Sequence, residues 1–221
     1  MITLVLESST YSGSAALLDG DVVLGARSLA MRGREHEALM PAVAELFAEA
    51  GAPPEVVGRV VCGAGPGSFT SLRISGSIAK GIAMASGAVL VPVSSLALLV
   101  ASREPQKAGR FLAIVDAMRG EQYVQLFDAD ADGEVNAIEA LRLVPTADID
   151  RLAEELGAIA IGPGRHGAAL VVPIASAAAR ITKLIDGTAP ADLAAWEPGY
   201  GRLAEAQVKW EAEHGRPLQP Q

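Results

Sequence analysis

The stretch GAGPGSFTSLR, residues 63–73, has four glycines or prolines in its first five positions and then hydroxyl groups, an aromatic ring and an arginine. It follows the apolar run Val60, Val61 and Cys62 and precedes residues 70–86, which have the pattern of a helix. The stretch is therefore a strand-to-helix turn. Such a turn can present backbone N–H groups to phosphate or carboxylate, because a helix N-terminus carries partial positive charge. Close packing of backbone on backbone needs the same glycines, so a binding role and a packing role both stay open.

Strands and helices alternate on both sides of this turn. Residues 2–7 form an apolar run typical of a buried strand, and residues 13–29 are typical of two strands joined by a turn at Asp19 and Gly20. Apolar residues at helical spacing predict a helix from about residue 35 to residue 50, with Gly51 as its stop. The other elements expected in this half are strands over 59–65 and 89–93, the helix over 70–86 and a short helix over 94–102.

The opening pattern recurs after a polar connection at residues 103–109. Glu7 ends the first strand of one copy, and Asp116 ends the first strand of the other. We expect two related α/β lobes, residues 1–105 and 106–221, that face each other across a cleft and bring these two strand ends together. The elements expected in the second lobe are strands over 110–116, 122–128 and 158–161, an acidic turn at Asp132 and Gly133, and helices over 148–156 and 174–185.

The composition is that of a globular, acidic protein. Half of the 221 residues are hydrophobic, which suffices for a sizeable core, and the formal net charge is −8. A protein that grips nucleic acid by itself usually has a basic surplus, so autonomous RNA binding is disfavoured. No apolar run reaches the roughly 18 residues of a membrane span, and the N-terminus has no signal-peptide pattern, so a cytoplasmic protein is expected. The lone Cys62 is expected to be an inert buried thiol.

The glycine-rich turn matches no common catalytic motif. No Gly-Lys-Ser/Thr follows it, and Ser68 stands where a dinucleotide fingerprint would have its third glycine. Ser68 also lacks the glycine two residues later that a nucleophile elbow requires. His36, His166 and His214 lie far apart and match no metal-ligand spacing. We therefore expect neither catalytic residues nor a metal site.

The two strand-end carboxylates are the candidates for a nucleotide contact. If the lobes fold as the repeat suggests, Glu7 and Asp116 could meet a magnesium nucleotide. Acidic residues at strand ends are also common as solvated turn formers, and this alternative stays open.

The two long helices of the first half suggest a surface for a partner. The helix over 35–50 offers large apolar side chains, and the helix over 70–86 offers a ridge of small ones on which another helix could lie closely. Burial inside the same domain is the competing explanation. The candidate interface residues are Leu39, Met40, Val43, Phe69, Arg73, Gly76, Ala79 and Ala83.

Five segments in order along nearly the whole chain carry a family resemblance. They are LVLESST, GAGPGSFTSLRISGSIAKGIA, VPVSSLALL, VDAMRGEQY and the tail EPGYGRLAEAQVKWE. The chain resembles the TsaB (YeaZ) family, the bacterial partner of TsaD in making the threonylcarbamoyladenosine modification of tRNA. The most specific element is the run from Gly65 to Arg73. The sequence departs from the family pattern at Glu7, where Asp is usual, at Ser71, at Met118 and at Gly201.

The resemblance implies an α/β fold of the actin-like ATPase (ASKHA, ribonuclease H-like) type with two related lobes. It implies a non-catalytic scaffold subunit, an inactive paralogue of TsaD, in the complex that forms N6-threonylcarbamoyladenosine at position 37 of tRNAs reading ANN codons. TsaD carries paired metal-binding histidines where this chain has residues 94–98. The implied partners are TsaD, TsaE and a second copy of the chain. The chain is expected to contact tRNA only through the complex. No cofactor is expected to bind tightly, and ATP or ADP with magnesium is expected at the interface of the complex.

Two other functions stay open. An independent ATPase or phosphotransferase would use Glu7 and Asp116 and would turn over ATP without a partner. A peptidase is suggested by the older glycoprotease label of the wider family, but neither a nucleophile-base pair nor a metal set is visible in the sequence.

Overall fold

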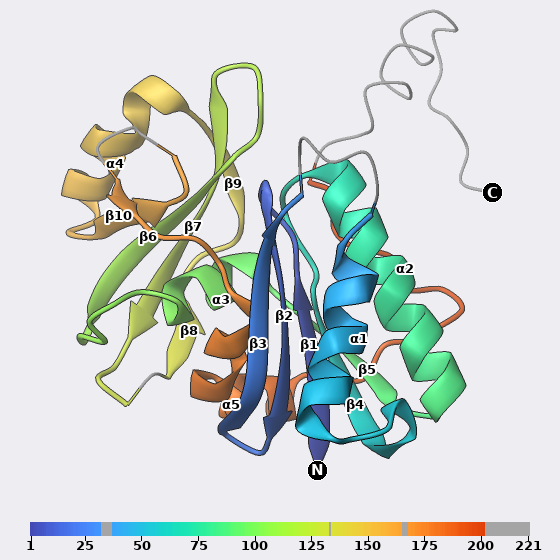
Figure 1. Ribbon diagram of the computed structural model, residues 1–221. Helices are drawn as coiled ribbons and strands as arrows, with labels where there is room; N and C mark the ends of the chain where they lie inside the picture. Colours follow the sequence, from blue (N-terminus) through green and yellow to red (C-terminus); the bar gives the residue numbers. More distant parts are fainter. Residues whose placement is uncertain (32–36, 133, 165–167, 202–221) are drawn as a thin grey trace, which may run out of the picture.

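The computed structural model describes residues 1–31, 37–132, 134–164 and 168–201, which form two α/β lobes side by side (Figure 1). Each lobe is built on its own sheet. The strands are β1 (Ile2–Glu7), β2 (Ser12–Asp19), β3 (Val22–Ala30), β4 (Val57–Gly63), β5 (Val89–Val93), β6 (Gly109–Asp116), β7 (Glu121–Ala129), β8 (Val135–Ala137), β9 (Arg142–Pro145), β10 (Ile159–Gly162) and β11 (Ala169–Leu170). The helices are α1 (Leu39–Ala50), α2 (Phe69–Ser86), α3 (Ser95–Ala101), α4 (Ile149–Glu155) and α5 (Thr182–Gly187), with short 3-10 turns η1 (Pro54–Val56), η2 (Thr146–Asp148) and η3 (Ala175–Arg180).

The first sheet has the strand order β3-β2-β1-β4-β5. The central strand β1 runs antiparallel to β2, with Glu7 opposite Ser14, and parallel to β4, with Leu6 opposite Cys62. A connection between parallel strands needs a crossover. Helix α1 leads from β3 to β4, which lies beside β1, and α2 joins β4 to its parallel neighbour β5. This arrangement is the ribonuclease H-like unit of the actin-like ATPase fold and confirms the expected fold class.

The second sheet repeats this order as β8-β7-β6-β10-β11. Its central strand β6 is antiparallel to β7 and parallel to β10, as β1 is to β2 and β4. The internal repeat predicted from the sequence is therefore present, and Glu7 and Asp116 end equivalent strands. The strand β9, which also pairs with β7, has no counterpart in the first sheet. Gly133 of the predicted acidic turn lies outside the described residues.

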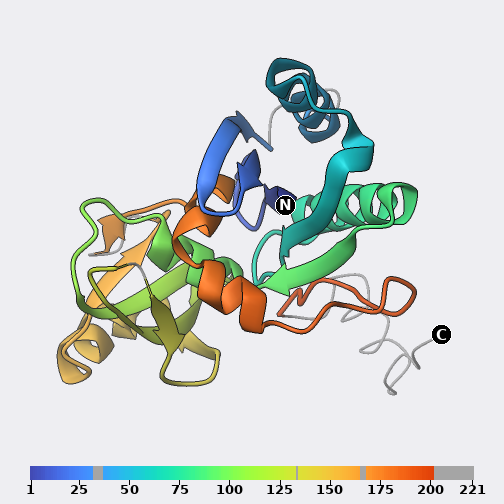
Figure 2. The ribbon, with the colours of Figure 1, turned by 90° about the horizontal axis from the view of Figure 1, so that it is seen from below.

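The molecule is layered because successive residues of each strand face opposite sides of its sheet. Leu4 and Leu6 of β1 pack under α1 and α2, whereas Val5 points to the other lobe. The layer between the two sheets contains α3, η3 and α5. Together with both sheets it forms one hydrophobic core. Figure 2 shows η3 and α5, in orange, between the two lobes. The outer face of the second sheet is covered by α4.

The chain returns to the first lobe after α5. Ala191 donates its N–H to the carbonyl of Leu90 at 2.8 Å, and Trp196 packs on the core beneath α1 and α2. We call residues 191–201 the C-terminal strap; it runs beside β5 and α2 (Figure 1 and Figure 2). The division of the chain at residue 105 stays a prediction, but the strap packs with the first sheet although it follows the second in sequence.

Several predicted boundaries need correction. Helix α1 starts at Leu39 and not near residue 35: residues 37 and 38 are not helical, and residues 35 and 36 lie outside the described part of the chain. It ends at Gly51 in the left-handed conformation, as predicted. The helix expected over 174–185 is two pieces: η3 ends at Arg180, and the next residue, Ile181, has a φ of −120° that breaks the helical path before α5. Within the described residues, no helix is long and apolar enough to cross a membrane.

Candidate functional site

The backbone of the glycine-rich turn forms hydrogen bonds with other parts of the same chain. Ser68 donates its N–H to the Ser9 carbonyl at 2.7 Å, and Gly65 donates to Ser95 Oγ at 3.1 Å. Gly199 of the C-terminal strap donates its N–H to the Ala64 carbonyl at 2.7 Å. These contacts join the turn to three other segments that are far apart in the sequence.

Two glycines of the turn are required by close approaches of the backbone. A Cβ on Gly65 would lie 2.3 Å from the carbonyl oxygen of Gly199, and φ there is +89°. A Cβ on Gly67 would lie 2.0 Å from the carbonyl oxygen of Ser9. Of the two roles left open by the sequence, backbone packing accounts for both glycines.

Glu7 is completely buried beneath the turn. Its Oε1 accepts the Ser9 N–H at 2.6 Å, and its Oε2 accepts the Ser95 hydroxyl at 2.8 Å. Burial raises the pKa of Glu7, and the hydrogen bonds from Ser9 and Ser95 act in the opposite direction. Beside it in β4, burial and the charge of Glu7 raise the pKa of Cys62 to about 12, as expected of an inert thiol.

Asp116 has the opposite environment. It is exposed at the end of β6, and its Oδ1 accepts the N–H of Met118 at 2.8 Å, so it shapes the β6–β7 turn. Glu7 is thus enclosed and its carboxylate accepts hydrogen bonds from its own lobe, whereas Asp116 faces solvent. The nucleotide contact through Glu7 and Asp116 stays a prediction.

Most of the predicted interface residues are internal. Leu39 and Val43 in α1, and Ala79 and Ala83 in α2, are fully buried in the core between these helices and the first sheet. Their assignment to a partner surface is wrong, because Leu39 and Val43 pack in the core of their own lobe and the small side chains of α2 let that helix lie close to its own sheet. Gly76 is also covered, since a Cβ there would meet Pro198 of the strap at 3.1 Å.

Other side chains of the same two helices are exposed. Met40, Phe69 and Arg73 from the predicted set reach the surface, and so does Met84, which is 70% exposed. Met84 was missed because the prediction followed the small residues of α2 and not the opposite side of the helix. A large apolar residue between small ones, as Met84 is between Ala83 and Ala85, could have indicated the exposed side of α2.

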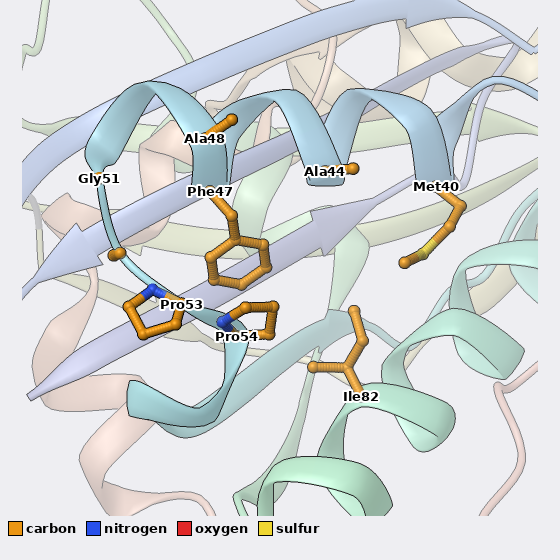
Figure 3. A pocket seen from close by; sticks show the side chains of 9 residues that line it. Met40, Ala44, Phe47, Ala48, Gly51, Pro53, Pro54 and Ile82 are labelled. Carbon is orange, nitrogen blue, oxygen red and sulfur yellow. The ribbon is translucent and has the colours of Figure 1, made fainter.

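A shallow apolar groove of about 520 Å³ lies between α1 and α2. In Figure 3, Met40 and Phe47 point from α1 toward Ile82 of α2, with two prolines near the end of α1. The lining residues are Met40, Ala44, Phe47, Ala48, Gly51, Ala52, Pro53, Pro54 and Ile82. An open groove of this composition suits an apolar surface of another protein better than a charged small molecule.

The strap shapes the start of α2. The ring of Tyr200 lies 4.5 Å from that of Phe69, and the Arg73 guanidinium lies 5.4 Å from the Phe69 ring centre. Lys80 Nζ donates to the Trp196 carbonyl at 3.0 Å, which holds the strap along the helix. Tyr123 of the second lobe donates its hydroxyl to the Tyr200 carbonyl at 3.3 Å, so the strap also joins the two lobes.

Among the described residues no group of three or more His, Cys, Asp and Glu side chains could hold a metal ion. His36, His166 and His214 all lie outside those residues.

Comparisons with known proteins agree with this fold. The family model of TsaD, tRNA N6-adenosine threonylcarbamoyltransferase, matches residues 32–161, more than half of the chain. The tRNA threonylcarbamoyladenosine biosynthesis protein TsaB of Haemophilus influenzae is 33% identical over 121 residues, 54% of this chain and 51% of that protein. TsaB of Bacillus subtilis is 32% identical over 127 residues, 58% of this chain and 55% of that protein. The matched part thus spans about half the length of these relatives.

A solved structure covers more of the chain. The crystal structure of an uncharacterized protein with similarity to the peptidase YeaZ, from Pseudomonas aeruginosa, has a TM-score of 0.76 and 25% identity, and the alignment covers 91% of this chain and 99% of that one. Two related lobes and the matched segment define a protein related to the TsaD threonylcarbamoyltransferases. Within that class, the chain belongs to the TsaB (YeaZ) family, as its sequence motifs predict.

Proposed function

We propose that this protein is a non-catalytic subunit of the complex that forms N6-threonylcarbamoyladenosine at position 37 of tRNAs reading ANN codons, and that it binds and supports TsaD. The observation that carries the proposal is the apolar groove with exposed side chains on both of its flanking helices, in a chain of the TsaB family. In this proposal TsaE is a further partner, and ATP or ADP with magnesium binds at the interface of the complex. The isolated chain pairs with a second copy of itself through the same surface that binds TsaD. This subunit contacts tRNA only through the complex, because a net charge of −8 disfavours direct binding to nucleic acid.

The contact with TsaD is assigned to the outer sides of α1 and α2. Met40 is exposed at the groove, Met84 is exposed on α2 outside the groove, and Phe69 and Arg73 extend the surface toward the strap. Burial of such side chains against a partner removes apolar area from water, at about 25 cal/mol per Å². A small number of large side chains usually dominates an interface of this kind.

Replacement of Met84 by aspartate should weaken binding to TsaD at least about tenfold, because a charge would enter the apolar contact. The matched control is Leu170→Asp, at a residue of the second lobe that is 75% exposed and lies away from the groove. Affinities of the purified full chains for TsaD, measured by calorimetry, separate the two variants. If Met84→Asp binds TsaD as tightly as the wild type does, α2 is not part of the interface. If the wild type does not bind TsaD at all, the proposal is overturned.

Replacement of Asp116 by asparagine should leave the rate of tRNA modification in the reconstituted complex within a few-fold of the wild type. The exposed carboxylate accepts the Met118 N–H of its own turn, and an asparagine oxygen can accept the same N–H. Nucleoside mass spectrometry measures the modified tRNA. A loss of about a hundredfold or more with folded protein would instead favour the ATPase alternative, since deletion of a charge that stabilises a transition state has that size of effect.

A further inference from the structure

We propose that Glu7 is a positioning residue that holds the glycine-rich turn and thereby sets the start of α2. It is a fully buried carboxylate between the turn and the body of the first lobe, and it has no place in the proposed contact with TsaD. A buried carboxylate is costly unless hydrogen bonds compensate for its lost hydration, and the bonds that it accepts from Ser9 and Ser95 both lead to the turn.

The first connection runs through Ser95. Glu7 Oε2 accepts the Ser95 hydroxyl at 2.8 Å, and this fixes the Ser95 oxygen as the acceptor for the Gly65 N–H at 3.1 Å. The backbone N–H of Ser95 donates in return to the Gly65 carbonyl, also at 3.1 Å. Glu7 thus orients the hydroxyl that holds one end of the turn.

The second connection runs through Ser9. Glu7 Oε1 accepts the Ser9 N–H at 2.6 Å, and the Ser9 carbonyl accepts the Ser68 N–H at 2.7 Å. Ser68 is the residue immediately before α2. Gly65 and Ser68 of the turn are therefore each connected to the same carboxylate through one intervening residue, Ser95 and Ser9 respectively.

The space for this carboxylate is provided by Gly63 in β4. A Cβ on Gly63 would overlap Glu7 Oε2 and would lie only 2.9 Å from Ser95 Oγ. Any larger residue there would displace the carboxylate from its bonds. Glu7 and Gly63 are consequently a matched pair, which makes the proposal testable by exchange of both.

The turn leads directly into the exposed Phe69 and Arg73. Their position depends on the turn, so displacement of Glu7 should also weaken binding to TsaD. That consequence rests on the proposed function. The effect on the turn itself does not.

The experiment measures amide hydrogen exchange of the full-length chain by NMR, for the wild type, Glu7→Asp and Ser95→Ala. An aspartate can still accept the N–H two residues on, at Ser9, but is too short for Ser95. Exchange at Gly65 should therefore become at least about tenfold faster in both variants, while Ser68 in Glu7→Asp stays within about threefold of the wild type. The Leu4 and Leu6 amides of β1 serve as the internal control for global stability.

A double variant at Glu7 and Gly63 distinguishes positioning from simple core packing. Gly63→Ala alone should accelerate exchange at Gly65, because its methyl group evicts the carboxylate, and it should weaken TsaD binding. Glu7→Asp combined with Gly63→Ala should exchange at Gly65 no more than about threefold faster than Glu7→Asp alone, because the shorter side chain has already left the space that the methyl group takes. Additive damage in the double variant, or acceleration shared equally by Leu4 and Leu6, would overturn the proposal. Altered exchange with unaltered TsaD affinity would retain the positioning role and count only against the proposed interface.

Discussion

Ala79→Arg is expected to abolish the cooperative fold. Ala79 lies fully buried between α2 and the first sheet, in the core that also contains Leu4 and Leu6. An arginine there would bury an unpaired charge, at a cost of several kcal/mol, and would overfill a packed layer. A domain of this size has only about 5–15 kcal/mol of stability in total. Urea denaturation followed by circular dichroism, together with soluble yield, measures the effect.

The matched control is Ser77→Arg, two residues earlier on the exposed side of the same helix. It should change the free energy of unfolding by less than about 0.5 kcal/mol. A partner-facing Ala79, as expected from the sequence, would instead give a folded Ala79→Arg monomer that fails to associate. A wild-type urea midpoint for that variant would contradict the packing described here.

Gly65→Ala is expected to reduce the free energy of unfolding by about 3 kcal/mol or more, from backbone strain and a steric clash together. Its φ of +89° is strained for any residue with a Cβ, at about 1–3 kcal/mol. The added methyl group would also lie 2.3 Å from the Gly199 carbonyl oxygen, so the strap would have to move. Displacement of the strap should then release Tyr200 from Phe69 and loosen the link to Tyr123.

Gly87→Ala measures the cost of backbone strain without the steric clash. Gly87 has a φ of +72°, and apart from its chain neighbours no atom lies within 4 Å of the position that a methyl group would take, so only backbone strain should appear there. The difference between the two variants in urea denaturation measures the contact between turn and strap. A Gly65→Ala variant no less stable than Gly87→Ala would show that the strap does not hold the turn.

The periodic elements could be predicted because their patterns are local. Strand β1 and strand β5 have the boundaries that the sequence predicts, and α2 begins one residue earlier than predicted. The repeat was visible because each copy opens with an apolar strand that ends in a carboxylate. The short strands β8, β9 and β11 were missed, since two to four residues of pairing leave too little pattern and depend on neighbours from elsewhere in the sheet.

The site was predicted less well because spacing along a helix does not say which side meets the sheet. The small residues of α2, such as Ala79, suit a partner helix and a sheet equally well. Glu7 had the position of a nucleotide ligand at a strand end. Its burial follows from Ser9 in the same segment and from Gly63 and Ser95 on two other segments, which come together only when the lobe is folded.

The sequence by itself determined the α/β class, the two-lobed repeat and the family, because these follow from the order of apolar runs, turns and motifs along the chain. Only the tertiary structure decided that Glu7 is enclosed while Asp116 is exposed, although both end equivalent strands. It also decided that the strap, and not a partner, covers Gly76. The physical reason is that burial and hydrogen bonding are set by segments distant in sequence, here Ser95 in α3 and Pro198 in the strap, which no local pattern around the buried residue encodes.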